Sequence, residues 1–279
     1  MKKTLFLSLL FATTMLSAQK PVELPLWPDG APNTNGLTGN QEDLEGGRVA
    51  NVVNPSITVY RPAKPNGMAV IMCPGGGYGR LAMNHEGHDM AAWFTTQGIT
   101  YAVLKYRMPN GHHEVPLSDA EQAIRLMRGH AKEWGVNPNR IGIMGASAGG
   151  HLAASLATLY SSDATRPDFQ VLFYPVISML KGVTHSGSRK TSSEKRLPPN
   201  WNRSTRSNGK YLPKRRKHSS CCRQMMQAFC PSTASAISSP CKSRKFPPLC
   251  MSTPPADMAG AFVTVSPTNA NGPGNWKNG

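Results

Sequence analysis

The stretch GIMGASAGGHLAASL, Gly142–Leu156, places a serine between an apolar run and a helical pattern. Its centre, Gly145–Gly149, reads G-x-S-x-G, a pattern in which the serine occupies a sharp turn from strand to helix and glycines leave room for that turn. The first amides of such a helix point toward charge that develops on a nearby oxygen. We therefore predict Ser147 as a nucleophile, the alternative being plain close packing of small residues.

A second glycine-rich turn precedes this one. The sequence CPGGGY, Cys73–Tyr78, follows a short apolar run. Three consecutive glycines allow backbone amides to face a negatively charged oxygen, so we predict that the amides of Gly76, Gly77 and Ala148 form an oxyanion hole. A phosphate-binding loop is the alternative, but the turn lacks the Lys-Ser/Thr pair of a P-loop and the spacing of a dinucleotide fingerprint.

Apolar strands alternate with amphipathic helices through the first two-thirds of the chain. The expected strands are residues 56–60, 68–73, 99–106, 141–145 and 169–177, and the expected helices are residues 84–98, 116–135 and 148–160. Ser118 and Glu121 form a capping box for the second helix. Residues 23–47 are turn-rich and polar, which indicates a surface lead-in. The alternation predicts an α/β fold with a mostly parallel sheet and helices on both faces.

The N-terminus has the pattern of a secretory signal peptide. Lys2 and Lys3 precede an apolar run, Leu5–Met15, and the sequence LSAQ follows. We predict cleavage after Ala18 and a secreted or periplasmic protein. A buried N-terminal helix is the alternative, whereas a membrane anchor is disfavoured because the run is too short to span a bilayer.

The basic character of the chain is concentrated at its C-terminal end. The formal net charge is +16, yet residues 1–190 carry 17 Lys and Arg against 13 Asp and Glu, while residues 191–279 carry 14 against 2. The latter segment also has few apolar residues and no regular period, which predicts a basic low-complexity tail without ordered structure. Its five cysteines form no C-x-x-C pair, so no zinc site is expected. We predict an α/β domain over residues 19–190, incomplete after about residue 190.

Three separated segments carry a family resemblance. Cys73–Phe94, Tyr101–Arg128 and Ile141–Thr158 resemble, in this order, the secreted α/β-hydrolase esterases of the acetylxylan and feruloyl esterase type, which accompany bacterial xylan breakdown. The resemblance implies an α/β-hydrolase fold and hydrolysis of esters on acylated plant polysaccharide without a metal or an organic cofactor. It assigns the nucleophile to Ser147. One departure is Pro74, where many members of the family have histidine.

The same resemblance implies that Gly76, Gly77 and Ala148 supply the oxyanion donors. A serine nucleophile also needs a base and an acid that orients the base. In this fold the expected chain order is serine, acid, histidine. After Ser147 the acids are Asp163, Asp168, Glu194 and Asp257, and the histidines are His151, His185 and His218. None follows a late strand, and His185, the best of them as a base, comes too soon after the nucleophile.

The genetic code offers an explanation for the missing pair. If one base is lost near Lys190, the original frame joins the last base of each codon to the first two of the next. In that frame Met225–Met226 must encode aspartate, and Asp257–Met258 must encode histidine or tyrosine, with glycine next. Both fall where the acid and the base are expected. We therefore predict a frameshift that removed them and left a damaged esterase; a genuine basic tail is the alternative.

Other histidines carry weaker signals. His85 and His88 lie three apart in an expected helix without a third ligand, so a polar helix face is favoured over a metal site. His112 and His113 precede a proline and are expected near the substrate rim. His151 is expected to pack inside its helix.

Three alternative functions stay open. The first is another enzyme, a serine peptidase with the same fold. A polyanion- or nucleic-acid-binding protein would use the basic run at residues 210–218, but this run lies in the suspect segment, so no nucleic-acid partner is predicted. A catalytically inactive protein that keeps its pocket for carbohydrate is the third alternative.

Overall fold

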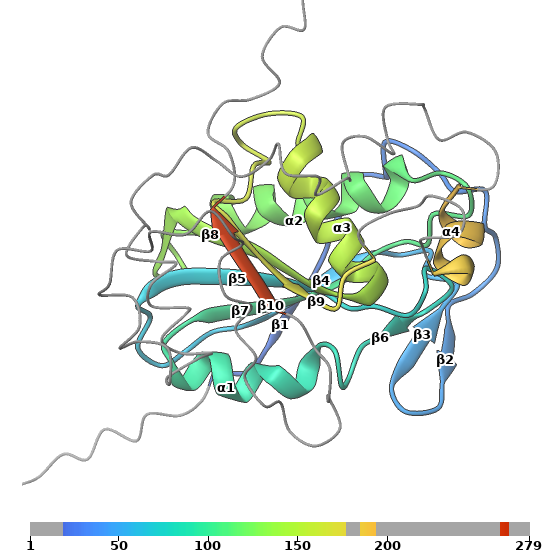
Figure 1. Ribbon diagram of the computed structural model, residues 1–279. Helices are drawn as coiled ribbons and strands as arrows, with labels where there is room; N and C mark the ends of the chain where they lie inside the picture. Colours follow the sequence, from blue (N-terminus) through green and yellow to red (C-terminus); the bar gives the residue numbers. More distant parts are fainter. Residues whose placement is uncertain (1–18, 177–184, 194–262, 268–279) are drawn as a thin grey trace, which may run out of the picture.

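The computed structural model describes residues 19–176, 185–193 and 263–267. Helices lie on both faces of a central sheet, with α2 and α3 on one face and α1 on the other (Figure 1). The strands are β1 (Val22–Pro25), β2 (Glu42–Leu44), β3 (Arg48–Ala50), β4 (Ser56–Tyr60), β5 (Gly67–Cys73), β6 (Leu81–Ala82), β7 (Thr100–Lys105), β8 (Val136–Ala146), β9 (Phe169–Phe173) and β10 (Val263–Pro267). The helices are η1 (His88–Met90, a 3-10 helix), α1 (Ala91–Thr96), α2 (Glu114–Gly129), α3 (Ser147–Leu159) and α4 (Ser186–Ser193).

The central sheet has seven strands in the order β1-β4-β7-β5-β8-β9-β10, and a smaller sheet has the order β2-β3-β6. Strands β7, β5, β8 and β9 are parallel neighbours, and the strands beyond them on either side are antiparallel. The predicted α/β class is confirmed, with a parallel centre and antiparallel edges. Because parallel strands end at one edge of a sheet, the loops after β5, β8 and β9 lie together.

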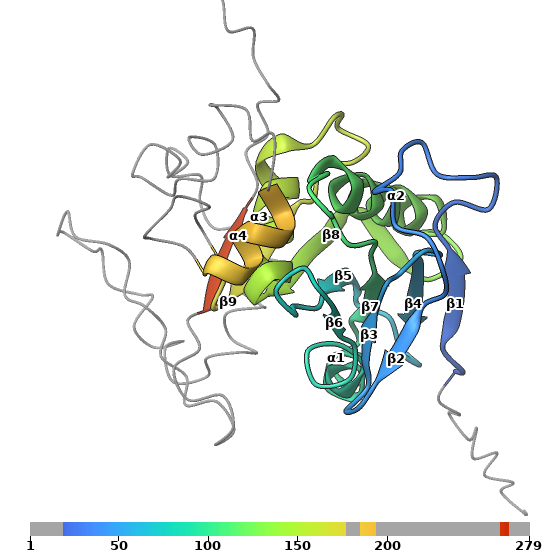
Figure 2. The ribbon, with the colours of Figure 1, turned by 90° about the vertical axis from the view of Figure 1, so that its right-hand side faces the viewer.

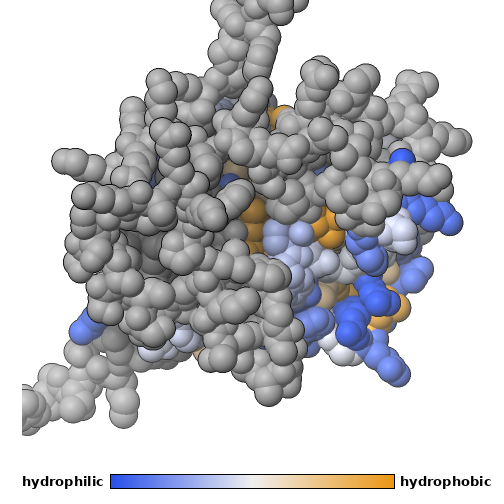
Figure 3. Space-filling model, in the orientation of Figure 1, coloured by the Kyte–Doolittle hydropathy of each residue, from blue (hydrophilic) through white to orange (hydrophobic). Residues whose placement is uncertain are grey.

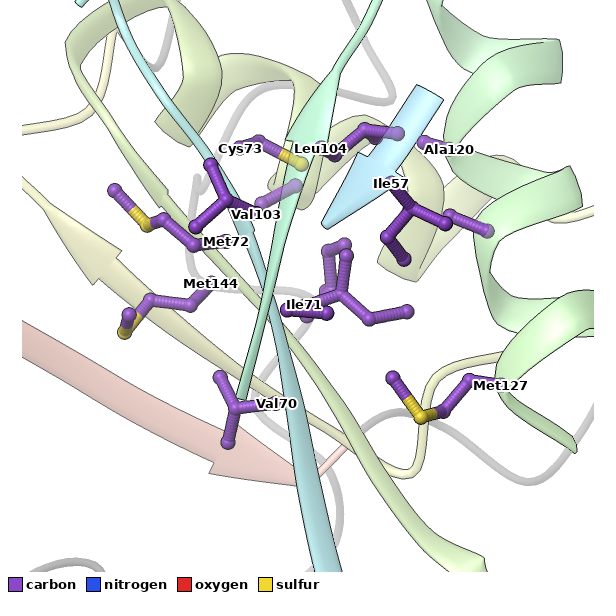
Figure 4. Close-up of a cluster of buried hydrophobic side chains, with 14 of the residues drawn as sticks. Ile57, Val70, Ile71, Met72, Cys73, Val103, Leu104, Ala120, Met127 and Met144 are labelled. Carbon is purple, nitrogen blue, oxygen red and sulfur yellow. The ribbon is translucent and has the colours of Figure 1, made fainter. Parts of the chain in front are cut away.

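The core explains why β5 is an unbroken apolar run. Successive side chains of a strand point to opposite faces, and both faces of this sheet are covered by helices. Val70 and Met72 point to one face and Ile71 to the other, toward Met127 of α2 (Figure 4). All four side chains are fully buried.

The helix expected over residues 84–98 is shorter in the structure. Residues 84–87 form a turn, in which the Gly87 amide donates to the Asn84 carbonyl at 3.0 Å and the His88 amide donates to the Met83 carbonyl at 2.8 Å. A β-carbon at Gly87 would collide with the Met83 carbonyl and lie 2.9 Å from Val103 Cγ1, so the chain passes here too closely for a side chain. The α-helix begins only at Ala91, and His85 therefore lies in a turn.

The expected capping box at Ser118 is also wrong. Helix α2 begins at Glu114 with His113 as its N-cap residue, and the Ser118 hydroxyl donates to the Val115 carbonyl at 2.8 Å inside the helix. Pro116 lies in the first turn of the helix, where backbone amides have no intrahelical acceptor, so its lack of an amide proton removes no helical hydrogen bond.

The lead-in over residues 23–47 contributes more to the fold than its composition indicates. Strand β1 pairs antiparallel with β4 along the sheet edge, and Leu26 is fully buried in the core. Proline-flanked strands are found at sheet edges because proline cannot donate to a ladder, and Pro25 ends β1. The short β2 and β3 then form an antiparallel pair.

One strand lies within the tail that was expected to have no ordered structure. Strand β10 pairs antiparallel with β9, from Val263 opposite Phe173 to Pro267 opposite Phe169. Its sequence VTVSP is rich in β-branched residues, which fit a pleated strand, and the edge of β9 is available to it. The rest of the tail after Ser193 and the expected signal peptide, residues 1–18, lie outside the described residues. In the parts of the chain that the structure describes, no helix has the length and apolar character to cross a membrane.

Candidate functional site

Ser147 lies at the turn between β8 and α3. Its φ of 51° falls in the left-handed region that a residue with a side chain rarely adopts. The turn is compact: a β-carbon at Gly145 would collide with the Gly149 carbonyl, and one at Gly149 would collide with the Cys73 carbonyl at the end of β5. The glycines around the serine are therefore required by close backbone contact, as the G-x-S-x-G pattern indicated.

The glycine-rich loop after β5 lies directly against this turn. A β-carbon at Gly75 would be 3.0 Å from Ser147 Cβ, so the loop and the serine are in contact. Gly76 and Gly77 have φ values of 136° and 66°, conformations that turn their amides away from a regular ladder. Within the described part of the chain, neither amide donates to a backbone carbonyl. Ala148 lies in the first turn of α3, where amides also lack an intrahelical acceptor.

Glu86 is a site residue that the sequence reasoning missed. Its Oε2 accepts a hydrogen bond from the Gly75 amide at 2.6 Å, and its Oε1 accepts one from the Tyr174 hydroxyl at 2.8 Å. The side chain is only 13% exposed. The carboxylate therefore ties the glycine loop to the segment that follows β9. Its sequence surroundings, NHEGHD over residues 84–89, are polar and include a second acid, Asp89, so no local signal identifies Glu86.

Tyr174, the second partner of Glu86, lies on a backbone segment that is itself bound to the serine turn. Its φ of 31° lies in the left-handed range. Two residues later, the Val176 amide donates to the Ser147 carbonyl at 3.0 Å, which returns the chain to the serine turn. Burial raises the pKa of the Tyr174 phenol, and the hydrogen bond to Glu86 raises it further. The hydroxyl consequently stays protonated and donates to the carboxylate at neutral pH.

A buried phenol also holds the start of the glycine loop. The Tyr106 hydroxyl donates to the Pro74 carbonyl at 2.7 Å, and burial keeps the pKa of this phenol well above its usual value. Pro74 is the position at which the sequence departs from the histidine of many family members. Here the position contributes its carbonyl to the support of the loop.

Helix α4 contacts the same loop from another direction. The Thr191 hydroxyl donates to the Gly77 carbonyl at 2.7 Å, and the Gly111 amide donates to the Thr191 carbonyl at 3.1 Å. His185 precedes this helix, and its Nδ1 accepts the Ser188 amide at 3.1 Å. This is the geometry of a side-chain N-cap. The best histidine that the sequence offered as a base is thus engaged in capping α4.

The acids after Ser147 are engaged elsewhere as well. Asp168 precedes β9, at the edge of the sheet opposite to the nucleophile, and its Oδ2 accepts the Ile141 amide at 2.9 Å and lies 3.5 Å from Arg128 Nη2. Burial raises the pKa of the Asp168 carboxyl. Asp163 has an 85% exposed side chain and pairs with Arg166. Glu194, His218 and Asp257 lie outside the described residues.

His151 packs inside α3 against Tyr78. Its Nδ1 lies 2.8 Å from the Tyr78 hydroxyl, and the two rings meet edge to face. Burial, with a smaller contribution from the nearby His113, lowers the pKa of His151 to about 4. The imidazole is therefore neutral at pH 7 and serves the packing of α3 against the glycine loop.

This buried imidazole predicts a loss of stability in acid. In the unfolded chain a histidine takes up a proton near pH 6.5, whereas in the folded protein His151 does so only near pH 4. The stabilisation is therefore complete above pH 6.5 and is lost as the pH falls toward 4, by about 3 kcal/mol. Urea unfolding at pH 7 and pH 4.5 measures it. His151→Asn, which keeps an acceptor for Tyr78, should lose distinctly less stability over this range; equal losses would contradict the assignment.

The remaining histidines do not form a metal site in the described residues, where no group of three ligating side chains is found. His88 Nδ1 lies 2.8 Å from the Tyr60 hydroxyl, and burial lowers the pKa of this histidine. His112 and His113 lie at the start of α2, each beside Glu114 at 3.2 and 3.6 Å. Their expected place at a substrate rim remains a prediction.

Comparison with known proteins places this architecture in a family. The BD-FAE family model matches residues 57–182. The chain is 47% identical over 129 residues to an acetylxylan esterase from Xylanibacter ruminicola, covering 46% of this chain and 27% of that protein. It is 34% identical over 136 residues to endo-1,4-beta-xylanase B from Butyrivibrio fibrisolvens, covering 44% and 21%. The chain thus spans only 27% of the length of the first relative and 21% of the length of the second.

A solved structure extends the similarity to most of the fold. The acetyl ester-xyloside bifunctional hydrolase from Caldicellulosiruptor lactoaceticus is 32% identical, with a TM-score of 0.51, and the match covers 66% of this chain and 68% of that one. The serine turn, the glycine loop and the parallel strands that bring them together all lie within residues 57–182, which the family model matches. The chain belongs to the α/β-hydrolase esterases of the xylan-associated type.

Proposed function

We propose that this chain is built to hydrolyse carboxylic esters carried on plant polysaccharide or on small alcohols. The observation that carries the proposal is the contact between the Ser147 turn and the glycine loop at Gly75. It places a serine on a strained turn beside amides that are not used by the sheet. The similarity to an acetylxylan esterase and to an acetyl ester-xyloside bifunctional hydrolase supports the acyl class and the polysaccharide.

The geometry indicates how such a reaction proceeds. Ser147 Oγ attacks the acyl carbon, and the carbonyl oxygen becomes an oxyanion that accepts hydrogen bonds from the amides of Gly76, Gly77 and Ala148. The alcohol leaves with a proton, and water then attacks the acyl-serine and releases the carboxylic acid. Both attacks require a base that accepts a proton from the attacking hydroxyl group.

We propose that this base and its orienting acid were encoded in the gene but are not translated in the printed frame. The described histidines after Ser147 are engaged with Tyr78 and with the cap of α4, and the described acids lie at the opposite edge of the sheet or on the surface. In the alternative frame after Lys190, aspartate is forced at Met225–Met226, and histidine or tyrosine at Asp257–Met258. Sequencing of codons 188–192 from fresh DNA tests the frame directly.

The reaction class has its own test. Purified protein with one base inserted after codon 190 is offered p-nitrophenyl acetate and peptide p-nitroanilides of matched concentration, with Ser147→Ala in the same frame as the control. We expect release of nitrophenol that depends on Ser147, and no release of nitroaniline. Preferential cleavage of the anilides would favour the serine peptidase alternative, and ester cleavage unchanged in Ser147→Ala would contradict the assigned nucleophile.

The cellular location follows from the N-terminal pattern alone. We propose that residues 1–18 direct the chain to the periplasm or the exterior and are removed after Ala18. A polymeric substrate that is too large to enter a cell agrees with this location.

A further inference from the structure

A polar groove of about 280 Å³ lies between the small sheet and the antiparallel side of the central sheet. This volume is close to the lower end of the range for small-molecule sites, about 300 Å³. Strands β2 and β3 contribute one wall, with Asp43 and Arg48, and β1 and β7 contribute the other, with Glu23 and Lys105. The groove is separate from the nucleophile turn, and nothing in the reaction outlined above uses it.

The charges in the groove balance each other. Lys105 Nζ lies 3.4 Å from Glu23 Oε1, which also accepts the Ser56 hydroxyl at 2.6 Å. On the opposite wall, Asp43 accepts a hydrogen bond from Gln41 at 2.9 Å, and Arg48 donates to a backbone carbonyl. Two carboxylates thus face two cations, so the groove has no net attraction for a strongly charged ligand.

The lining also offers apolar surface between these polar groups. Leu44, Val49 and Met83 contribute side chains to it, and Leu44 is 38% exposed. Hydrophilic and hydrophobic residues alternate on the surface at the end of the molecule where β2 and β3 lie (Figure 3). A ligand that matches both features carries many hydroxyl groups on an uncharged ring with C–H faces, which describes a neutral sugar.

The position of the groove relates it to the catalytic edge. Ser56 at the start of β4 lies opposite Lys105 at the carboxyl end of β7, so both lie at the edge where β5 and β8 end. Strand β7 is two strands from β8, a separation of about 10 Å at normal strand spacing. The views in Figures 1 and 2 agree that β2, β3 and β6 lie at this same end of the sheet.

The turn after β6 connects the groove to the nucleophile. Met83 and Asn84 line the groove, and Glu86 in the same turn accepts the Gly75 amide of the glycine loop. The turn after β6 therefore borders both the groove and the loop beside Ser147.

We propose that this groove is a glycan subsite, which binds the neutral sugar backbone two strands away from the ester under attack. The assignment to xylan rests on the proposed function, whereas the binding of an uncharged sugar chain does not require any hydrolysis. The two hypotheses can thus fail separately.

The test is calorimetric titration of the full chain with xylotetraose, an unacylated probe that an esterase does not cleave. The groove variant is the double substitution Asp43→Ala and Arg48→Ala, and Lys105→Gln alters the other wall. The matched control, Asp163→Ala and Arg166→Ala, removes an acid–base pair at the opposite edge of the sheet, in which the Asp163 side chain is 85% exposed and that of Arg166 22%. Thermal unfolding of each variant checks that it folds.

We expect xylotetraose to bind the unaltered chain and the control equally, and each groove variant about tenfold more weakly, because one or two charge-assisted hydrogen bonds are lost. Ser147→Ala in the frame-restored protein should bind as the unaltered chain does while its ester hydrolysis disappears, which separates this proposal from the proposed function. Absence of binding to the folded chain, equal binding by the groove variants, or tighter binding of inorganic phosphate than of xylotetraose would overturn it.

Discussion

Insertion of one base after codon 190, to restore the alternative frame, is expected to raise kcat/KM for p-nitrophenyl acetate by about 10⁴-fold over the printed chain. The physical reason is that a serine with an oxyanion hole but no base retains only the part of the catalysis that comes from binding and from the hole, and loss of a triad member has an effect of about this size. The measurement compares the two purified proteins under identical conditions.

The control for this result is Ser147→Ala in the frame-restored protein, which should return the rate to that of the printed chain. A restored protein that folds but hydrolyses no faster would contradict the proposal that the missing acid and base are encoded after Lys190. It would favour the inactive carbohydrate-binding alternative instead. A printed chain that already turns over at the restored rate would show that its own residues supply the base.

Glu86→Ala is expected to lower kcat of the frame-restored enzyme by about 10²-fold with little change in KM. The substitution removes the acceptor of the Gly75 amide and of the Tyr174 hydroxyl, so the glycine loop loses its fixed position beside Ser147. A displacement of about 1 Å in a catalytic group has an effect of this magnitude. Steady-state kinetics with p-nitrophenyl acetate separate kcat from KM.

The conservative variant distinguishes positioning from charge. Glu86→Gln keeps an oxygen for the Gly75 amide, and its amide group can donate to the Tyr174 hydroxyl, so we expect it to recover most of the lost rate. Glu133→Ala serves as the control, because Glu133 is a surface carboxylate with a 61% exposed side chain. If the Gln variant were as slow as the Ala variant, the negative charge of Glu86 would take part directly, and the positioning role would be wrong.

The parallel centre of the fold was predictable because its signals are local. Strand β5 is apolar on both faces, and the G-x-S-x-G pattern lies between a strand and a helix, so the sequence shows which strands are central and where the turn with positive φ falls. The contact between Gly75 and Ser147 follows from parallel strands that end at one edge.

The parts that were missed depend on contacts between distant residues. Strand β1 has only four residues and becomes a strand by pairing with β4, more than 30 residues later. Glu86 is defined by two partners, Gly75 and Tyr174, that lie 11 and 88 residues away. The start of α2 was misplaced because Ser118 and Glu121 satisfy a capping pattern that the helix does not use. Each of these needs the folded arrangement before the sequence can be interpreted.

Strand β10 has a consequence for the fate of the translated chain. The outer ladder of β9 would otherwise present unpaired amides and carbonyls beside the buried residues Val171 and Leu172, and such a rim attracts strands from other molecules. Backbone ladders depend on conformation and not on side-chain identity, so five residues of the basic tail suffice to cover it. A short C-terminal segment can in this way protect the sheet from self-association whatever the rest of the tail encodes.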